Sequence, residues 1–367
     1  MRDASLDQDE SAEIPLETQA SIQAGTLEQG IDQVRRAAAL VRANIHQVIV
    51  GKDAEIDLLL VALLCEGHVL LEDVPGVGKT MLAKSLARSL GCNFQRIQCT
   101  PDLLPSDITG ITYYNQKTGE FAFRPGPLLT QIVLADEINR ATPRTQSALL
   151  EAMEERQISV ERETMALPRP FLVIATQNPI ELEGTFPLPE AQLDRFLLRL
   201  RLGYPDGEEE RTMLRRFRQA QPLDDLQPVL SAQELLALQQ VVKQVIITEP
   251  VETYLLDLVQ ATRSQPAIDL GASPRAALAL EHAAQALAAI NGRAFVRPDE
   301  VKLLALSVLA HRLILSAQAR LRGRAADQAI RDLIASVPTP VEAVGLGTSA
   351  AAGSEQPAQA AFQKGQR

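Results

Sequence analysis

Short runs of apolar residues alternate with helical patterns along the first half of the chain, from about residue 31 to residue 204. Five runs have the composition and length of strands, at residues 68–74, 93–99, 131–135, 171–176 and 197–202. Strands that are apolar almost throughout and are separated by helices are typical of a parallel sheet covered on both faces. This part of the chain is therefore predicted to fold as an α/β domain.

Two helices are well marked between these strands. Leucine recurs at every fourth position through residues 80–90, and Gly91 follows as a favourable residue at a helix C-terminus. Another helix is expected to begin at Thr142 and to continue to about residue 157, because threonine suits the N-cap and Pro143 suits the first helical position.

The second half of the chain has a different pattern. After Tyr-Pro-Asp-Gly at residues 204–207 the strand pattern ceases, and an Ala- and Leu-rich helical pattern continues to about residue 337. The first helix of this half carries glutamates at 208–210 and arginines in its later turns, which is the charge distribution that the helix dipole favours. We expect a smaller all-α domain here, with the boundary at Pro205.

The two ends of the chain lack sustained apolar periodicity. Residues 1–27 are acidic and Gln-rich, which is typical of a disordered tail or a loosely attached helix, and the C-terminal end is rich in Ala, Gly, Gln and Ser. The expected organisation is therefore a disordered acidic tail at 1–27, an α/β core at 28–204, a helical domain at 205–337 and a disordered tail at 338–367.

Composition excludes several classes of protein. The 367 residues include 36 Lys and Arg against 46 Asp and Glu, a net charge of −10, and 46% are hydrophobic. A chain this acidic, without Trp and with 4% aromatic residues, lacks the diffuse positive potential and the stacking groups that nucleic-acid binding uses. Binding of nucleic acid is therefore disfavoured.

Membrane and secretory classes are disfavoured as well. The longest apolar runs, at residues 58–65 and 303–310, are far shorter than the roughly 20 residues of a membrane-spanning helix. The acidic N-terminus has neither the basic region nor the apolar stretch of a signal peptide. Cys65, Cys92 and Cys99 have no metal-ligand spacing, and we expect reduced thiols in a cytoplasmic protein.

A glycine-rich turn at residues 72–80, Glu-Asp-Val-Pro-Gly-Val-Gly-Lys-Thr, joins the end of one predicted strand to the start of a helix. Phosphate binding requires this context, because backbone N–H groups and the helix N-terminus both point at the anion. Gly76 and Gly78 allow close approach of the backbone, Lys79 reaches the β- and γ-phosphates, and Thr80 can bind Mg²⁺. The alternative is a strand–turn–helix that is glycine-rich by chance.

Two carboxylates, Asp136 and Glu137, end the predicted strand at 131–135. Open α/β sheets bind ligands at the carboxyl ends of their strands. Asp136 is therefore a candidate Mg²⁺ ligand, and Glu137 a candidate base that orients and deprotonates the attacking water. Without the phosphate loop, the same pair would be read as ordinary solvated residues at a strand end.

Two further polar residues occupy positions suited to phosphate recognition. Asn178 follows the strand at 171–176, where an amide can position water or sense a γ-phosphate. Arg275 lies in the first turn of a helix that begins at Ser273-Pro274, where a cation is unfavourable unless it meets an anion; a solvated surface arginine is the alternative. The absence of an Asn-Lys-x-Asp motif disfavours a GTPase.

Taken together, these motifs resemble the MoxR family of AAA+ ATPases. The resemblance extends from about residue 31 to 335 and is carried by six motifs in order: Leu-Glu-Asp-Val-Pro-Gly-Val-Gly-Lys-Thr at 71–80, Arg-Pro-Gly-Pro-Leu at 124–128, Leu-Ala-Asp-Glu-Ile-Asn-Arg-Ala at 134–141, Ala-Thr-Gln-Asn-Pro at 175–179, Leu-Asp-Arg-Phe at 193–196 and Gly-Ala-Ser-Pro-Arg at 271–275. Asp73 stands where the strict phosphate-loop pattern has glycine, a departure that many family members share.

The resemblance implies a fold and roles for individual residues. The fold is an AAA+ core with a parallel five-stranded sheet in the order 5-1-4-3-2 and a C-terminal helical lid. Asn178 matches the sensor 1 position, Arg195 matches the arginine finger given to the neighbouring subunit's ATP, and Arg275 matches sensor 2, which contacts the γ-phosphate of its own subunit. The implied nucleotide-binding residues are Val50, Gly51, Pro75, Gly76, Val77, Gly78, Lys79, Thr80 and Met81.

The resemblance also implies an activity and partners. It implies Mg²⁺-dependent ATP hydrolysis at the subunit interfaces of a ring, usually a hexamer, by a chaperone-like factor whose client carries a von Willebrand factor A domain. A nucleic-acid motor or transcription regulator on the same core is the alternative, against which the acidic charge and the missing Gly-Ala-Phe-Thr-Gly-Ala loop both weigh. A scaffold that binds ATP without hydrolysing it would not need Glu137.

A hairpin is predicted over residues 106–124, with a turn near Gly119 and with Tyr113 and Tyr114 on its first strand. In the family the corresponding insert projects toward the pore, so these tyrosines either contact a client or pack on the core. A second hairpin is predicted at 157–168. The four histidines are scattered without ligand spacing and are interpreted as structural or surface residues.

Overall fold

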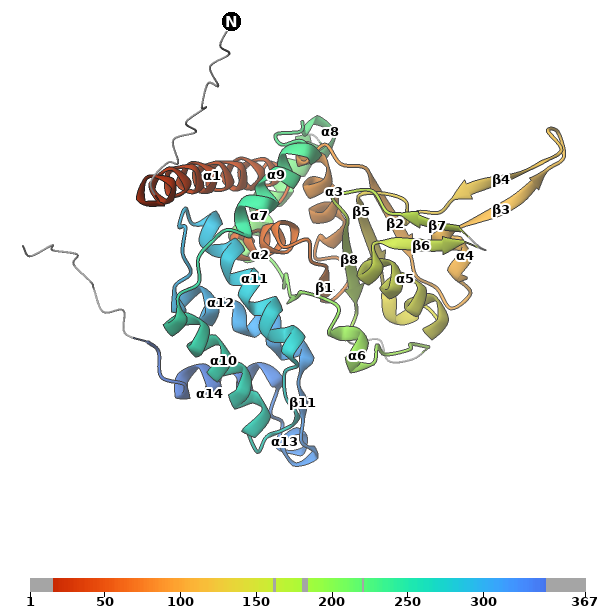
Figure 1. Ribbon diagram of the computed structural model, residues 1–367. Coiled ribbons are helices and arrows are strands. Elements are labelled where there is room, and N and C mark those ends of the chain that lie inside the picture. The colour runs from red at the N-terminus through yellow and green to blue at the C-terminus, as the bar shows by residue number, and fades with distance from the viewer. Residues whose placement is uncertain (1–15, 161–162, 180–183, 220, 341–367) are drawn as a thin grey trace, which may run out of the picture.

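The computed structural model describes residues 16–160, 163–179, 184–219 and 221–340. Figure 1 shows an α/β core, a helical lid beside it and a hairpin that projects from the core. No helix in these ranges is both long and apolar enough to cross a membrane.

The core contains a parallel sheet whose five strands correspond to the five predicted ones. They are β1 (Val69–Glu72), β2 (Phe94–Gln98), β5 (Ile132–Asp136), β8 (Leu172–Gln177) and β9 (Leu198–Leu200). Their order in space is β2-β5-β8-β1-β9. Numbered along the chain as the core strands, this is 5-1-4-3-2, which confirms the expected AAA+ topology.

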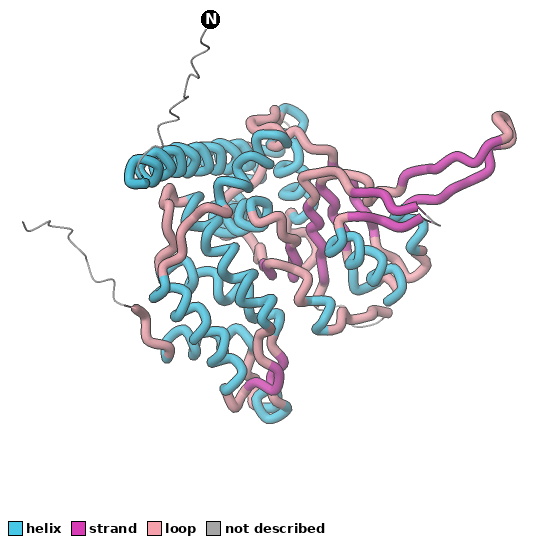
Figure 2. The backbone as a smooth tube through the Cα atoms, in the orientation of Figure 1, coloured by secondary structure: helices cyan, strands magenta, loops and turns pink. Residues whose placement is uncertain are grey.

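Helices cover both faces of this sheet (Figures 1 and 2). The core helices are α1 (Leu16–Ile45), α2 (Asp53–Leu64), α3 (Lys79–Ser89), α4 (Pro105–Thr109), α5 (Pro143–Glu155) and α6 (Glu190–Leu193), with a 3₁₀ turn at Ile138–Arg140. Thr142 caps α5 as predicted, because its side chain accepts a hydrogen bond from the backbone N–H of Thr145. The strands β1, β5 and β8 are buried because helices cover both of their faces, whereas β2 at the edge of the sheet has exposed positions.

Both predicted hairpins are present. The first pairs β3 (Gly110–Asn115) with β4 (Glu120–Pro125) and extends away from the body of the molecule (Figure 2). Tyr114 lies opposite Phe121 on it, with the two rings edge to face at 5.4 Å between centroids. The second pairs β6 (Gln157–Val160) with β7 (Glu163–Ala166). Tyr113 and Tyr114 are 45% and 54% exposed, so they do not pack into the core.

The second half of the chain is mainly helical. Its helices are α7 (Gly207–Gln219), α8 (Pro222–Asp225), α9 (Ala232–Val242), α10 (Glu249–Ser264), α11 (Pro274–Ile290), α12 (Pro298–Leu309), α13 (Ala317–Leu321) and α14 (Ala326–Ser336), with a 3₁₀ turn at Ala310–Arg312. One detail differs from the expectation that strands cease after residue 207. The short strands β10 (Ile268–Leu270) and β11 (Ile314–Leu315) pair antiparallel. Strands this short have too little periodicity to be recognised in a sequence.

The lid and the core share one apolar interior. A single buried cluster includes Val41 of α1, Leu71 of β1, Leu198 of β9, Leu255 of α10 and Leu280 of α11. A second cluster lies on the other face of the sheet, between its strands and α5. The lid helices α9 and α11 pack on α1 and α2 of the core, and α12 packs on β9 at the edge of the sheet.

The N-terminal segment forms part of a long helix. The segment 1–27 is expected to be a disordered tail or a loosely attached helix, and α1 begins at Leu16, so its described part is helical. The long helix exists because its later turns bury Ile31, Val34 and Val41 in the core, and packing extends a helix beyond what its first residues favour. Residues 1–15 and 341–367, where the rest of the expected tails falls, lie outside the described residues.

Candidate active site

The predicted phosphate-binding loop, at residues 73–78, joins the end of β1 to the start of α3. Gly76 and Gly78 have φ angles of 88° and 93°, in the left-handed region that favours glycine, and the space beside each is open. The Nζ of Lys79 donates to the backbone oxygens of Asp73 at 2.8 Å and Val74 at 3.3 Å. Burial lowers the pKa of Lys79, and the carboxylates of Asp136, Asp73 and Glu137 oppose that effect. The loop thus holds a cation inside a turn of open backbone, as an anion cradle requires.

The contacts of the Asp73 side chain account for an aspartate at the position where the strict motif has glycine. The side chain is nearly buried, at 8% exposure. Its Oδ1 accepts a hydrogen bond from the backbone N–H of Val74 at 2.8 Å, and its Oδ2 accepts one from Gly203 at 2.7 Å. Gly203 follows β9 and precedes the lid, so Asp73 ties the phosphate loop to the segment that joins core and lid.

The strand register brings the expected carboxylate Asp136 to the same edge of the sheet. Asp136 lies opposite Gln98 of β2, and the end of β8 lies on its other side. Its Oδ2 accepts hydrogen bonds from Nε and Nη2 of Arg96 at 3.1 and 2.5 Å, and its Oδ1 accepts one from the hydroxyl of Thr176 at 2.6 Å. Charge-assisted bonds of this kind fix the orientation of a carboxylate.

Glu137 adopts a left-handed backbone conformation, with φ 57°, which is uncommon for a residue other than glycine. Its N–H donates to the hydroxyl of Thr176 at 2.8 Å. Its Oε2 accepts from Nε2 of Gln98 and Nη1 of Arg140, each at 3.0 Å. Asn178 follows β8 immediately, and its side chain is buried at 6% exposure. The carboxyl ends of β1, β5 and β8 therefore gather the loop lysine, both carboxylates and the candidate sensor amide.

Sequence reasoning missed three residues of this edge: Arg96, Gln98 and Thr176. All three act on Asp136 or Glu137 through side-chain hydrogen bonds. The available signal was the polar composition of β2, whose exposed positions include Arg96 and Gln98 in an otherwise apolar sheet. Only the register between β2 and β5 shows what these side chains face.

The donor set of this edge fits Mg²⁺. Thr80 offers a hydroxyl at the start of α3, and Asp136 offers a carboxylate, which are the hard oxygen ligands that Mg²⁺ takes together with phosphate and water. No group of three or more His, Cys, Asp or Glu side chains that could hold a metal occurs in the described ranges. A resident metal centre built by the protein alone is not found among these residues.

Val50 and Gly51, two of the expected nucleotide-binding residues, lie beside the start of the lid. Gly51 has a φ of 65°, and a Cβ at this position would come within 1.8 Å of the carboxylate of Glu209 on α7. The neighbouring Lys52 donates from Nζ to the backbone oxygen of Tyr204 at 3.2 Å. The segment at 50–52 therefore packs against the joint between core and lid.

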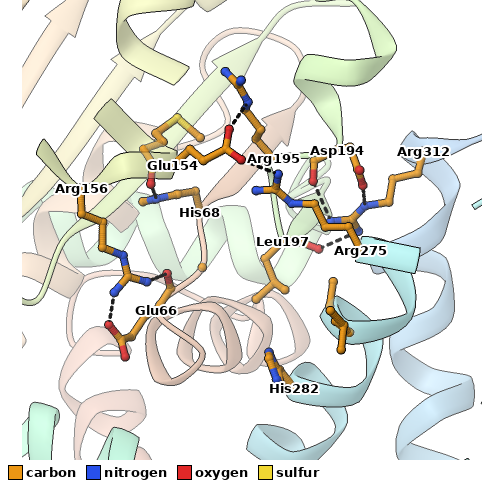
Figure 3. Close-up of a pocket in the computed structure, with 14 residues that line it drawn as sticks. Glu66, His68, Glu154, Arg156, Asp194, Arg195, Leu197, Arg275, His282 and Arg312 are labelled. Carbon is orange, nitrogen blue, oxygen red and sulfur yellow. Dashed lines mark hydrogen bonds and ion pairs between the residues drawn. The ribbon is translucent and has the colours of Figure 1, made fainter. Parts of the chain in front are cut away.

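The two expected phosphate-sensing arginines lie together at the opposite edge of the sheet (Figure 3). The Nε of Arg195 bonds Oε2 of Glu154 at 2.8 Å, and Nη1 of Arg275 bonds Oε1 of the same carboxylate at 2.9 Å. They line a pocket of about 280 Å³ together with His68 and Arg312. Arg195 directly precedes β9 and His68 directly precedes β1, so this pocket lies at the amino ends of these parallel strands.

Arg275 is expected to contact the γ-phosphate of its own subunit, and this role stays a prediction. In the protomer, the phosphate loop follows the carboxyl end of β1, whereas the pocket of Arg275 lies at its amino end. A strand of four residues spans roughly 13 Å. Arg275 therefore shares the edge of Arg195, away from the phosphate loop of its own chain. The sequence could not show this, because the lid's placement depends on tertiary packing.

His68 is a structural histidine, as interpreted from the sequence. Its Nδ1 accepts from the N–H of Val173, and its Nε2 lies 3.0 Å from the backbone oxygen of Met153, so Nε2 carries the proton of a neutral imidazole. Burial lowers its pKa to about 4, and the positive charges of Arg156 and Arg275 act in the same direction, against the hydrogen bond to Met153.

Known proteins resemble this chain over most of its length. Residues 68–198 match the ATPase family associated with various cellular activities (AAA), and residues 260–333 match the AAA lid domain. The chain is 44% identical over 300 residues to chaperone MoxR1 of Mycobacterium tuberculosis, which covers 79% of this chain and 76% of that protein. It is 34% identical over 323 residues to protein MoxR of Paracoccus denitrificans, covering 81% and 95% of the two chains. A crystal structure of a candidate ATPase from Cytophaga hutchinsonii matches with a TM-score of 0.81 at 38% identity, over 87% of this chain and 100% of that one.

Proposed function

Because the chain belongs to the MoxR family of AAA+ ATPases, we propose that it hydrolyses ATP with Mg²⁺ at the subunit interfaces of a ring, as a chaperone-like factor. One observation carries the proposal. Lys79, Asp136 and Glu137 lie at the carboxyl edge of the sheet, whereas Arg195 and Arg275 lie at its amino edge. Each protomer then contributes two different halves of an ATP site.

At the carboxyl edge, the loop at residues 75–78 and Lys79 would bind the β- and γ-phosphates. Glu137 would orient the attacking water and accept its proton, and Asn178 would hold that water or the γ-phosphate. Gln98 and Arg140, which already bond to the carboxylate of Glu137, would keep it aimed. Thr80 and Asp136 would hold Mg²⁺, which supplies positive charge to the phosphates.

At the amino edge, Arg195 would reach the ATP of the neighbouring subunit. Arg275 shares its carboxylate partner Glu154 and therefore serves the same neighbour. An arginine supplied across an interface is worth roughly 10³–10⁵ in turnover in phosphoryl transfer. Assembly would thus be part of catalysis. In a closed ring, for which we propose six subunits, every protomer supplies arginines to one neighbour and binds ATP at a site that is completed by the arginines of the other.

We further propose that the ATP cycle remodels or matures a protein complex whose client carries a von Willebrand factor A domain. The support is the family and the exposed hairpin β3–β4, whose aromatic side chains Tyr114 and Phe121 are 54% and 76% exposed. A client would be held in the ATP state. Affinity purification with Glu137→Gln protein in ATP should therefore retain it, and retention of nucleic acid instead of protein would contradict this part.

The hydrolytic role of Glu137 is tested by Glu137→Gln. The amide cannot accept the proton of water, so phosphate release should fall by about 10²–10⁴-fold. ATP binding, measured by calorimetry, should persist because Lys79 and the loop are untouched. Glu151→Gln, an exposed carboxylate on α5, is the control and should behave as wild type. Normal turnover by Glu137→Gln would remove this residue from the mechanism.

A further inference from the structure

The carboxylate of Glu154 is shared between the two arginines of the amino edge. Each of its oxygens bonds one guanidinium: Oε2 bonds Nε of Arg195, and Oε1 bonds Nη1 of Arg275. We propose that Glu154 is a positioning residue that holds Arg195 and Arg275 as a pair on the face that meets the neighbouring subunit's ATP. This inference rests on the proposed function.

The ion pair with Glu154 involves Nε of Arg195 and leaves the two terminal amino groups of the guanidinium for a phosphate. In this ion pair, Oε2 of Glu154 lies 2.8 Å from Nε of Arg195, and the two terminal amino groups of Arg195 point away from Glu154 in Figure 3. The side chain of Arg195 is 29% exposed. A guanidinium held in this way presents its planar fork, which matches phosphate oxygens in bidentate fashion.

Glu154 is itself well placed to act as a fixed support. It lies in the last turn of α5, whose other face buries Leu149, Leu150 and Met153. Only about a third of its side chain is exposed. A site residue held by a packed helix is set more accurately than one held by a loop.

The lid brings Arg275 to this support through a separate set of bonds. The hydroxyl of Ser273, which caps α11, donates to Oδ2 of Asp194 at 3.0 Å, and Nε of Arg312 donates to Oδ1 at 2.6 Å. The side chain of Arg312 is 3% exposed and also donates to the backbone oxygens of Phe196 and Leu197. Core and lid are therefore locked at the residue next to Arg195.

Arg195 and Arg275 carry the same charge, so they can lie close together only with the carboxylate of Glu154 between them. Two guanidinium groups repel each other at short range, and a carboxylate between them turns that repulsion into two attractions. Without Glu154, Arg195 and Arg275 would separate and sample other rotamers. The pair would then meet a γ-phosphate in the right geometry only part of the time.

The test compares Glu154→Ala and Glu154→Gln with Glu155→Gln, the exposed carboxylate next to it on α5. We expect Glu154→Ala to lower kcat for ATP about 10- to 100-fold, the loss that slight misplacement of a reacting group causes. KM should change less than about twofold, because the groups that bind ATP lie on the neighbour. Glu154→Gln keeps one acceptor oxygen and should lose less, and Glu155→Gln should match wild type.

Mixing experiments separate positioning from a general structural effect. Glu154→Ala protein should regain activity when mixed with Lys79→Ala protein, since the two defects lie on opposite faces of a protomer. It should gain nothing from Arg195→Ala protein, because those two defects share a face. A folding defect would instead lower Tm and depress every mixture, which would overturn the proposal.

Two further outcomes would also contradict it. If Glu154→Ala hydrolyses ATP faster than wild type, Glu154 restrains the arginines rather than aiming them. If Glu154→Ala matches Glu155→Gln while Arg195→Ala is inactive, Glu154 has no positioning role and the proposed function stands without it. Full activity of Arg195→Ala would contradict the proposed function itself, and this inference with it.

Discussion

At the scale of single residues, the phosphate loop owes its shape to hydrogen bonds as much as to glycine. Asp73 accepts from the backbone N–H groups of Val74 and Gly203 with different carboxylate oxygens. A nearly buried carboxylate that satisfies two backbone donors costs stability when it is removed, because both donors lose their partner. The residue that breaks the strict motif is therefore a structural tie between the loop and the lid joint.

Restoring the strict motif should destabilise this protein. We expect Asp73→Gly to lower the free energy of unfolding by about 1–3 kcal/mol, measured by urea denaturation, because Val74 and Gly203 lose their acceptor. Asp73→Asn keeps one acceptor oxygen and should lose less. Equal or greater stability of Asp73→Gly would show that the two hydrogen bonds contribute nothing.

His68 should give the protein a pH-dependent stability. Its folded-state pKa is about 4, below the value of about 6.5 for an unfolded imidazole. Between these values the unfolded chain binds more protons, so the free energy of unfolding rises with pH, and the contribution is lost as pH falls from about 6.5 to 4. The loss amounts to about 3 kcal/mol when complete.

The variant His68→Gln isolates this effect. Glutamine can accept from Val173 and donate to Met153 without titrating, so its unfolding free energy should depend less steeply on pH between about 4 and 6.5. His311, which is also buried with a lowered pKa, is present in both proteins and cancels in the difference. Parallel pH curves for wild type and His68→Gln would contradict the assignment.

Residues of the active site differ in how far the sequence could predict them. Lys79, Asp136 and Glu137 belong to contiguous motifs, in which spacing along the chain fixes spacing in space. Arg96 and Glu154 do not, since each acts on a partner distant in sequence, through strand register or the packing of α5. No local pattern marks such residues.

At the scale of elements, long apolar patterns correctly predicted the helices and strands, whereas short patterns did not. The five parallel strands, both hairpins and the cap of α5 follow from periodicity and capping residues. The strands β10 and β11 and the start of α1 at Leu16 do not, because tertiary packing decides them. The position of the lid also depends on packing, and it decides that Arg275 lies at the amino end of the sheet rather than at the carboxyl end.

The N-terminus of α11 should be more sensitive than an ordinary helix start. Ser273 accepts from the N–H of Ala276 as the N-cap and also donates to Asp194 across the core–lid junction. Ser273→Ala should cost about 1 kcal/mol for the cap and a similar amount for the junction. Ser316→Ala, which removes the cap of α13, should cost the cap alone. Equal losses by thermal denaturation would mean that the junction bond contributes nothing.

At the scale of the whole molecule, the sheet separates the two halves of the chemistry. The phosphate loop and carboxylates lie at one edge, and the arginine pair lies at the other, with the length of β1 between them. Under the proposed function, a lone protomer therefore lacks part of its own site. The shared apolar interior of core and lid keeps the two edges in a fixed relation.

Assembly and activity should consequently rise together. Turnover per protomer should increase with protein concentration over the range in which light scattering shows oligomers forming with ATP and Mg²⁺. Arg195→Ala should assemble but hydrolyse roughly 10³-fold less. Turnover per protomer that is independent of concentration, in a monomeric protein, would argue against shared sites.

The most direct test mixes two inactive variants, Lys79→Ala and Arg195→Ala. The first lacks a working phosphate loop but keeps its arginine pair, and the second has the reverse defect. If sites form between protomers, mixed assemblies contain interfaces with an intact loop and an intact arginine, and ATP hydrolysis should return to a substantial fraction of wild type. If mixtures stay as inactive as each variant alone although both assemble together, the two halves do not meet across an interface.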